Sequence, residues 1–151
     1  MSGLPTLPGP INPALVVAGC LSATAAILHL AIIVNGAGWY RFFGAGEAMA
    51  RAAEKGRWTP AIVTVGIAVV LAIWSACALS GAGLLPGVPL LRPALCAITL
   101  VYVLRGLAIV PALVVPRTAA TSFWIWSSGI CLVFGAAHLI GLVQRWDALG
   151  A

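Results

Sequence analysis

The chain has 151 residues, of which 62% are hydrophobic and 7% are charged. Because soluble domains carry about 25% charged residues, this composition excludes a water-soluble globular protein. The net charge of +5 comes from cations that lie beside apolar runs, so it does not indicate a nucleic-acid surface.

Four apolar runs divide the chain, and each is long enough to cross the ~30 Å hydrocarbon core of a bilayer, which takes ~20 helical residues. They cover residues 13–35, 60–80, 93–115 and 123–143. Three runs begin with proline, which is tolerated at the first helical position, and Asn12 and Thr59 precede two of these prolines as N-caps. Because lipid offers no partner for backbone polar groups, such runs must form helices. The sequence therefore predicts an all-α polytopic membrane protein, a bundle of four transmembrane helices in a single domain over residues 1–151.

Residues 36–57, between the first two runs, predict an interfacial segment with a short helix. Glu47 stands at the start of a helix-forming stretch and Arg51 follows four residues later, which favours an ion pair between them. The glycines of this segment do not have the spacing of a P-loop or of a dinucleotide fingerprint. We expect the segment to lie along the membrane surface with its aromatic rings at headgroup depth. The predicted lip of this surface consists of Trp39, Tyr40, Arg41 and Glu47.

The distribution of lysine and arginine predicts the orientation. The loops after the first and third runs contain Arg41, Arg51, Lys55, Arg57 and Arg117, and the opposite side contains Arg92 and Arg145. Since cytoplasmic loops carry the excess of these cations, the pattern predicts a bacterial cytoplasmic (inner) membrane protein with both termini in the periplasm. No Lys or Arg precedes the first run, so we expect a retained span rather than a signal peptide.

Small residues at regular spacing predict where the helices pack closely. The stripes at four-residue spacing are Ala14, Ala18, Ser22 and Ala26 in the first run and Thr64, Ala68, Ala72, Ala76 and Ser80 in the second. We expect the first two spans to pair through these stripes. In the fourth run Gly135, His138 and Gly141 recur every three residues, which predicts a histidine on the most closely packed face.

The predicted spans contain three ionisable residues, His29, Arg105 and His138. Counted from the outer helix ends at 1.5 Å per residue, they lie roughly 23, 17 and 9 Å deep. Tyr102 shares a helix face with Arg105 and adds a hydroxyl group. Because the spans contain no carboxylate, the charge of Arg105 needs backbone carbonyls, such as that of Leu107 freed by Pro111, a bound anion or an acidic residue of a partner protein.

The two histidines admit three interpretations: structural hydrogen bonds between helices, a proton pathway that includes Arg105, or the axial ligands of one haem. The ~14 Å difference in their depths argues against haem within one chain, so no cofactor is predicted and haem is kept as an alternative. The four cysteines, Cys20, Cys77, Cys96 and Cys131, stand singly in the spans without a C-x-x-C motif. We therefore predict no metal site and expect these side chains to pack as small hydrophobic groups.

Catalysis has little support, because no serine stands beside a histidine or carboxylate in the sequence. We expect a non-enzymatic protein that binds a lipid-like or small hydrophobic ligand, or an accessory subunit of a membrane complex. Arg105 and Tyr102 would hold the polar head of that ligand, and His29 and His138 would line the interior. The alternatives are a small transporter or proton-coupled carrier and a haem or redox subunit. The expected partners are the bilayer, a bound lipid or hydrophobic molecule, another membrane protein or a second copy of the chain, but no nucleic acid.

Overall fold

The computed structural model describes residues 9–110 and 122–150, and all regular secondary structure in these residues is helical. The chain forms two compact units, one from Met1–Leu21 and Trp74–Ala151 and the other from Ser22–Ile73. Helices α1 (Pro13–Asn35) and α4 (Thr59–Gly81) contribute residues to both units. The prediction of an all-α protein is confirmed for the described residues.

Three helices have the length and composition of membrane spans. They are α1, α4 and α7 (Ser122–Gln144), and each agrees with a predicted apolar run to within one residue at either end. Each contains a stretch that is long and apolar enough to cross a bilayer. A helix closes its backbone hydrogen bonds internally, which is what a chain in hydrocarbon requires. The chain is therefore a multi-pass helical membrane protein.

Helix α5 (Leu91–Leu107) is shorter than the third predicted run. Its 17 residues extend ~26 Å, less than the ~30 Å of a hydrocarbon core. The last part of the predicted run, residues 111–115, lies outside the described residues, as does Arg117. A proline at position 111 has no N–H to donate to the Leu107 carbonyl four residues earlier, which agrees with a helix end at Leu107.

The predicted N-cap of α1 is present. Helix α4 begins one residue earlier than predicted, at Thr59, the residue expected to be its N-cap. Asn12 Oδ1 accepts a hydrogen bond from the Leu15 N–H at 2.9 Å, and Asn12 Nδ2 donates to Gln144 Oε1 at 2.8 Å. The Asn12 side chain thus joins the start of α1 to the end of α7. Thr59, in contrast, is itself the first residue of α4, and the Trp58 carbonyl accepts the hydrogen bond from Ile62 N–H.

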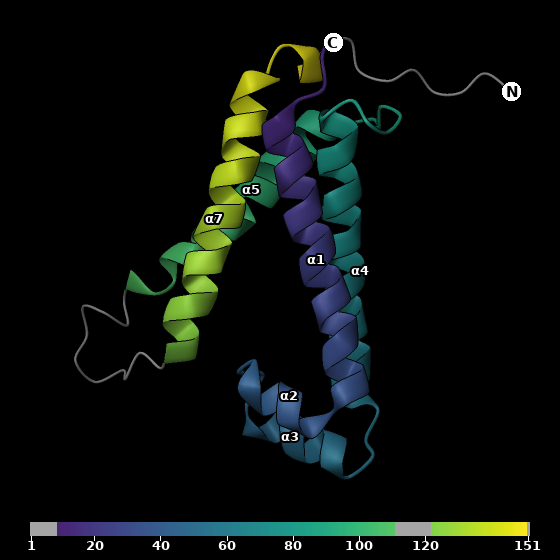
Figure 1. The fold of residues 1–151 in the computed structure, drawn as a ribbon, viewed down its shortest axis with the longest axis vertical. Helices are drawn as coiled ribbons and strands as arrows, with labels where there is room; N and C mark the ends of the chain where they lie inside the picture. Colours follow the sequence, from purple (N-terminus) through teal and green to yellow (C-terminus); the bar gives the residue numbers. More distant parts are fainter. Residues whose placement is uncertain (1–8, 111–121, 151) are drawn as a thin grey trace, which may run out of the picture. The chain divides into compact units, whose positions relative to one another are not determined.

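The interfacial segment folds as two short helices, α2 (Ala37–Phe42) and α3 (Glu47–Glu54), which pack against each other in the second unit (Figure 1). Gly46 precedes α3 with φ at +94°, in a region that L side chains rarely adopt, so a glycine is needed there. The short helix predicted to begin at Glu47 is confirmed.

In the first unit, α1 and α4 contact each other through small residues. Ser75 Oγ donates a hydrogen bond to the Gly19 carbonyl at 2.8 Å. A Cβ atom at Gly19 would lie 2.7 Å from Leu79 Cγ, so only glycine allows this approach. A buried hydroxyl bonded to a neighbouring backbone is a common device for joining membrane helices.

The buried positions of α4 agree in part with the predicted stripe. The predicted members Thr64, Ala68 and Ser80 are buried, whereas Ala72 and Ala76 are exposed. The other buried positions are Pro60, Leu71, Ser75, Ala78 and Gly81. With 3.6 residues per turn, a constant spacing of four drifts around the helix by about 40° at each step. Alternating steps of three and four stay on one face. On α1 the predicted members Ala18, Ser22 and Ala26 are buried.

Helices α5 and α7 lie side by side in the first unit, where the short 3-10 helix η1 (Ala148–Gly150) follows α7 (Figure 1). A Cβ atom at Gly135 would come within 2.9 Å of Val103 Cγ2, so this glycine allows close approach of the two helices. Gly135, His138 and Gly141 are all buried, which confirms the predicted packed face of α7.

Candidate functional site

The guanidinium group of Arg105 lies against the first turns of α7. Its Nη2 donates to Ser127 Oγ at 3.1 Å and its Nη1 to Ser128 Oγ at 3.3 Å. Its Cζ lies 5.3 Å from the ring centroid of Trp124, within the range of a cation–π interaction. We call Arg105, Trp124, Ser127 and Ser128 the arginine site.

The partners of Arg105 are neutral, so they do not neutralise its charge. The chain contains three Asp and Glu residues. Glu47 and Glu54 form ion pairs with Arg41, and Asp147 lies beyond the opposite end of α7 from the arginine site. Among the described residues, Arg105 forms no ion pair. A half-buried guanidinium that remains charged at any accessible pH can therefore bind an anion.

Arg105 stands near the C-terminal end of its helix. Its depth of roughly 17 Å, counted from the start of the third run at 1.5 Å per residue, stays a prediction. Because α5 ends at Leu107, Arg105 lies in its last turn. There the negative end of the helix dipole favours a cation. The contacts with Ser127 and Ser128 were not predicted, because nothing in the sequence places the start of α7 beside the end of α5.

Tyr102 and His138 form a second polar centre in the same unit. Their ring centroids are 5.1 Å apart, and the Tyr102 ring also contacts those of Trp74 and Phe134 at 5.0 and 5.3 Å. His138 is 0% exposed. The structure thus places the Tyr102 ring against that of His138. From the sequence, we expected the Tyr102 hydroxyl to bind the polar head of a ligand together with Arg105.

The imidazole of His138 has one nitrogen with a partner and one without. Its Nδ1 lies 2.9 Å from the Phe134 carbonyl oxygen, which can only accept, so Nδ1 carries the hydrogen. Its Nε2 is buried and has no hydrogen-bond partner in the described part of the chain. A buried acceptor that lacks a donor costs about 1–3 kcal/mol. His138 therefore offers an unused lone pair.

His29 belongs to the second unit and is only half buried. Its Nδ1 donates to the Ala25 carbonyl at 2.7 Å, the same bond to residue i−4 that His138 forms. This bond fits the structural interpretation, in which a histidine satisfies a carbonyl of its own helix.

The predicted lip contains one buried residue and an ion-pair network. Tyr40 is 2% exposed and packs with Ile32 and Ala50, so its ring is enclosed by protein. Its Oη lies 3.3 Å from Thr64 Oγ1. Trp39, in contrast, is exposed.

Arg41 is the centre of the ion-pair network. Its Nε and Nη2 donate to both oxygens of Glu47 at 2.9 and 3.0 Å, and its Nη1 donates to Glu54 at 2.7 Å. Arg51 Nε donates to Glu47 at 3.0 Å, which confirms the predicted pair. Hydrogen bonds from Arg41 and Arg51 lower the pKa of Glu47 to about 2, and a hydrogen bond from Arg41 lowers that of Glu54.

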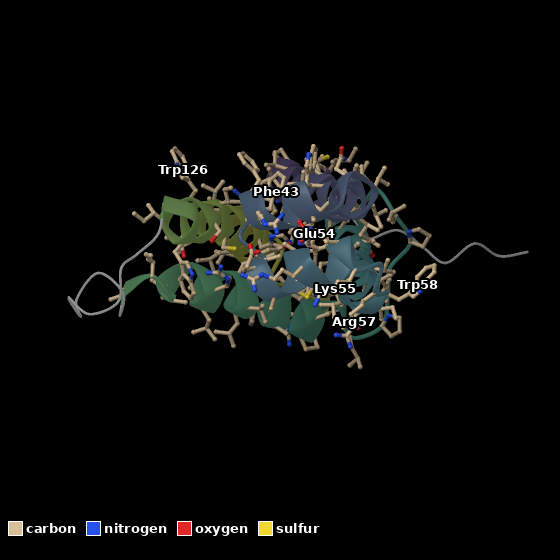
Figure 2. All side chains as sticks on the ribbon, turned by 90° about the horizontal axis from the view of Figure 1, so that it is seen from below. Phe43, Glu54, Lys55, Arg57, Trp58 and Trp126 are labelled. Atoms are coloured by element: carbon tan, nitrogen blue, oxygen red, sulfur yellow. The ribbon has the colours of Figure 1, made fainter. Side chains whose placement is uncertain are left out.

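Lys55, Arg57 and Trp58 gather at the turn between α3 and α4 (Figure 2). Trp58 is 80% exposed, and both cations are exposed as well. An exposed tryptophan beside exposed cations is typical of a segment at a membrane surface. The interfacial position of this part of the second unit stays a prediction.

Arg145 has a structural role that the sequence does not indicate. It is 7% exposed, and its Nη2 donates to the Ala82 carbonyl at 3.3 Å. The same carbonyl accepts the backbone N–H of Asn12 at 3.0 Å. Arg145 therefore joins the ends of α7 and α4, although the sequence presents it only as a cation that follows an apolar run.

The four cysteines form no disulfide bond. In the described residues, no group of three or more His, Cys, Asp or Glu side chains could hold a metal ion. Neither a scan against family models nor searches of curated proteins and solved structures give a match to this chain.

Proposed function

We propose that this chain is a non-enzymatic protein of the bacterial inner membrane that binds the phosphate group of an anionic phospholipid at the arginine site. In this proposal it has four spans, the third formed by residues 93–115, and both termini are periplasmic. The lip of α2 and α3 then lies at the cytoplasmic surface. The observation that carries the proposal is the charge of Arg105, which no carboxylate of the described chain neutralises.

The geometry of the arginine site supports an anion rather than a neutral ligand. A guanidinium group has five N–H donors, and the two serine hydroxyls use only part of them. Free donors in a planar fork match two oxygens of a phosphate. The Trp124 ring, 5.3 Å from Arg105 Cζ, adds a cation–π contact that uses none of these donors.

The position of the site supports a lipid as the source of that anion. The partners of Arg105, Ser127 and Ser128, are in the first two turns of α7, at the start of a span. The ends of spans lie near the headgroups, where phosphate is abundant. The positive end of the α7 dipole adds a further attraction for negative charge.

The test is native mass spectrometry of the full-length protein released gently from its membrane. We expect the wild type to retain a phospholipid and Arg105→Leu to retain it about tenfold less, since a hydrogen bond to a charged group contributes about 1.5–3 kcal/mol. Arg105→Leu should keep the melting temperature of the wild type or raise it, because it removes an unneutralised charge.

Arg92→Leu is the matched control, because Arg92 also stacks on a tryptophan, Trp146, with 4.9 Å between its Cζ and the ring centroid. This variant should retain the lipid. Equal retention by Arg105→Leu, or a wild type without bound lipid, would contradict the proposal. If the retained mass is a protein lost in Arg105→Leu, the chain is an accessory subunit whose partner supplies the acidic residue.

A further inference from the structure

His138 presents a hydrogen-bond acceptor inside a membrane helix. The bond from Nδ1 to the Phe134 carbonyl fixes the neutral tautomer in which Nε2 carries a lone pair. This atom is buried and has no partner in the described residues. What is missing is therefore a donor, and neither a second acceptor nor an anion would satisfy it.

The surroundings of this acceptor are aromatic. The ring of Tyr102 lies beside His138 and is itself enclosed by Trp74 and Phe134. The nearest charged residue on α5, Arg105, is one turn beyond Tyr102 and is held by Ser127 and Ser128. A neutral, flat molecule suits such surroundings, because apolar aromatic walls with one oriented polar group are typical of small-molecule sites.

From these observations we propose that His138 binds the hydroxyl group of a lipid-soluble phenol, of which a quinol is the example present in membranes. The hydroxyl donates to Nε2 in the plane of the imidazole, and the aromatic ring of the ligand packs against Tyr102. The ligand must dissolve in hydrocarbon, because His138 is 0% exposed and belongs to a helix with the composition of a span. Its entry requires a local opening of the side chains around Nε2.

A quinol and its quinone provide a matched pair of ligands for the test. They share the ring and the tail, but only the quinol has O–H donors. Decyl-ubiquinol and decyl-ubiquinone are compared by anaerobic equilibrium dialysis against the detergent-solubilised, full-length protein. We expect the wild type to bind the quinol about tenfold more tightly, as one hydrogen bond to an otherwise unsatisfied acceptor implies. This comparison needs no variant, so a folding defect cannot obscure it.

Variants then assign the preference to His138. His138→Phe should bind quinol and quinone equally, and His138→Gln, which has a carbonyl oxygen, should recover part of the preference. His29→Phe is the control, because His29 forms the same bond to residue i−4 but is half exposed. It should behave as the wild type does.

Three results would overturn the proposal. One is equal binding of quinol and quinone by the wild type, and another is a preference that survives in a folded His138→Phe. The third is a haemin titration that gives a His138-dependent Soret band without any quinol preference. The lone pair of His138 Nε2 would then coordinate the haem iron instead of accepting a hydrogen bond. Arg105→Leu should leave the quinol preference unchanged, which separates this site from the phospholipid site.

Discussion

Leu90 combines an exposed apolar side chain with a backbone conformation that does not suit it. Its φ is +61°, and it precedes α5 without a capping hydrogen bond from its side chain. The left-handed region costs an L residue about 1–2 kcal/mol, and glycine avoids this cost. Leu90 is also 79% exposed, so its removal loses little packing.

Leu90→Gly should therefore raise the free energy of unfolding by about 1 kcal/mol. The measurement is denaturant unfolding of the protein in detergent, followed by circular dichroism. Leu85→Gly, in the same loop but without a positive φ, is the control and should be neutral or destabilising. Equal destabilisation by both substitutions would refute the strain at Leu90.

The two histidines illustrate how little a residue's type and local bonds say about its use. Both donate from Nδ1 to the carbonyl four residues earlier. They differ in what surrounds Nε2, since His138 is buried beside Tyr102 and His29 is half buried. The surroundings of Nε2 depend on contacts between helices, and these contacts involve residues far apart in the sequence.

At the scale of elements, the pair α2 and α3 is held by charges at the surface as well as by its small apolar cluster. The pKa of Glu47, lowered from 4.5 to about 2, means that Arg41 and Arg51 stabilise the ionised carboxylate in the folded state. By linkage, this contribution is fully present above the unfolded pKa of 4.5. It is lost as the pH falls through about 2.

Selective ¹³C labelling of glutamate carboxyl groups would measure this directly, because the chain contains only two glutamates, Glu47 and Glu54. We expect the Glu47 signal to titrate near pH 2 in the wild type and to move toward 4.5 in Arg41→Gln. Lys55→Gln, which changes an exposed cation outside the network, should leave the midpoint in place. A Glu47 midpoint near 4.5 in the wild type would contradict the ion pairs.

At the scale of the whole molecule, the number of spans decides the topology. Three described helices are apolar enough to cross a membrane, and α5 alone, with 17 residues, is short for a span. An even number of spans places both termini on the same side, whereas three spans place them on opposite sides. The excess of cations between the first two spans favours a cytoplasmic position for that loop.

Fusions of a periplasm-active and a cytoplasm-active reporter to each terminus would test the topology. We expect both termini to report the periplasm, as four spans and the distribution of cations require. Replacing Arg51, Lys55 and Arg57 together by Gln should weaken this preference, because it removes most of the cations that hold the loop inside. A C-terminus that reports the cytoplasm while the N-terminus reports the periplasm would favour three spans.

The helices of this protein could be predicted from its sequence because each depends on local properties. The bounds of α1, α4 and α7 follow from uninterrupted apolar runs and from backbone groups that must bond internally in lipid. The Glu47–Arg51 pair follows from one turn of helix, and the packed face of α7 from glycines at regular spacing. The sequence also indicates Arg105 and His138 as candidate functional residues, since an ionisable group in an apolar span costs free energy.

Only the tertiary structure decided what these residues contact. It placed Arg105 on Ser127 and Ser128, buried Arg145 at the Ala82 carbonyl, and enclosed His138 with Tyr102. It also added Leu71, Ser75 and Ala78 to the buried face of α4 and left Ala72 and Ala76 exposed. The physical reason is that the partner of a side chain depends on the rotation and contact of separate helices. Those are set by packing over many residues, which no local pattern in the sequence records.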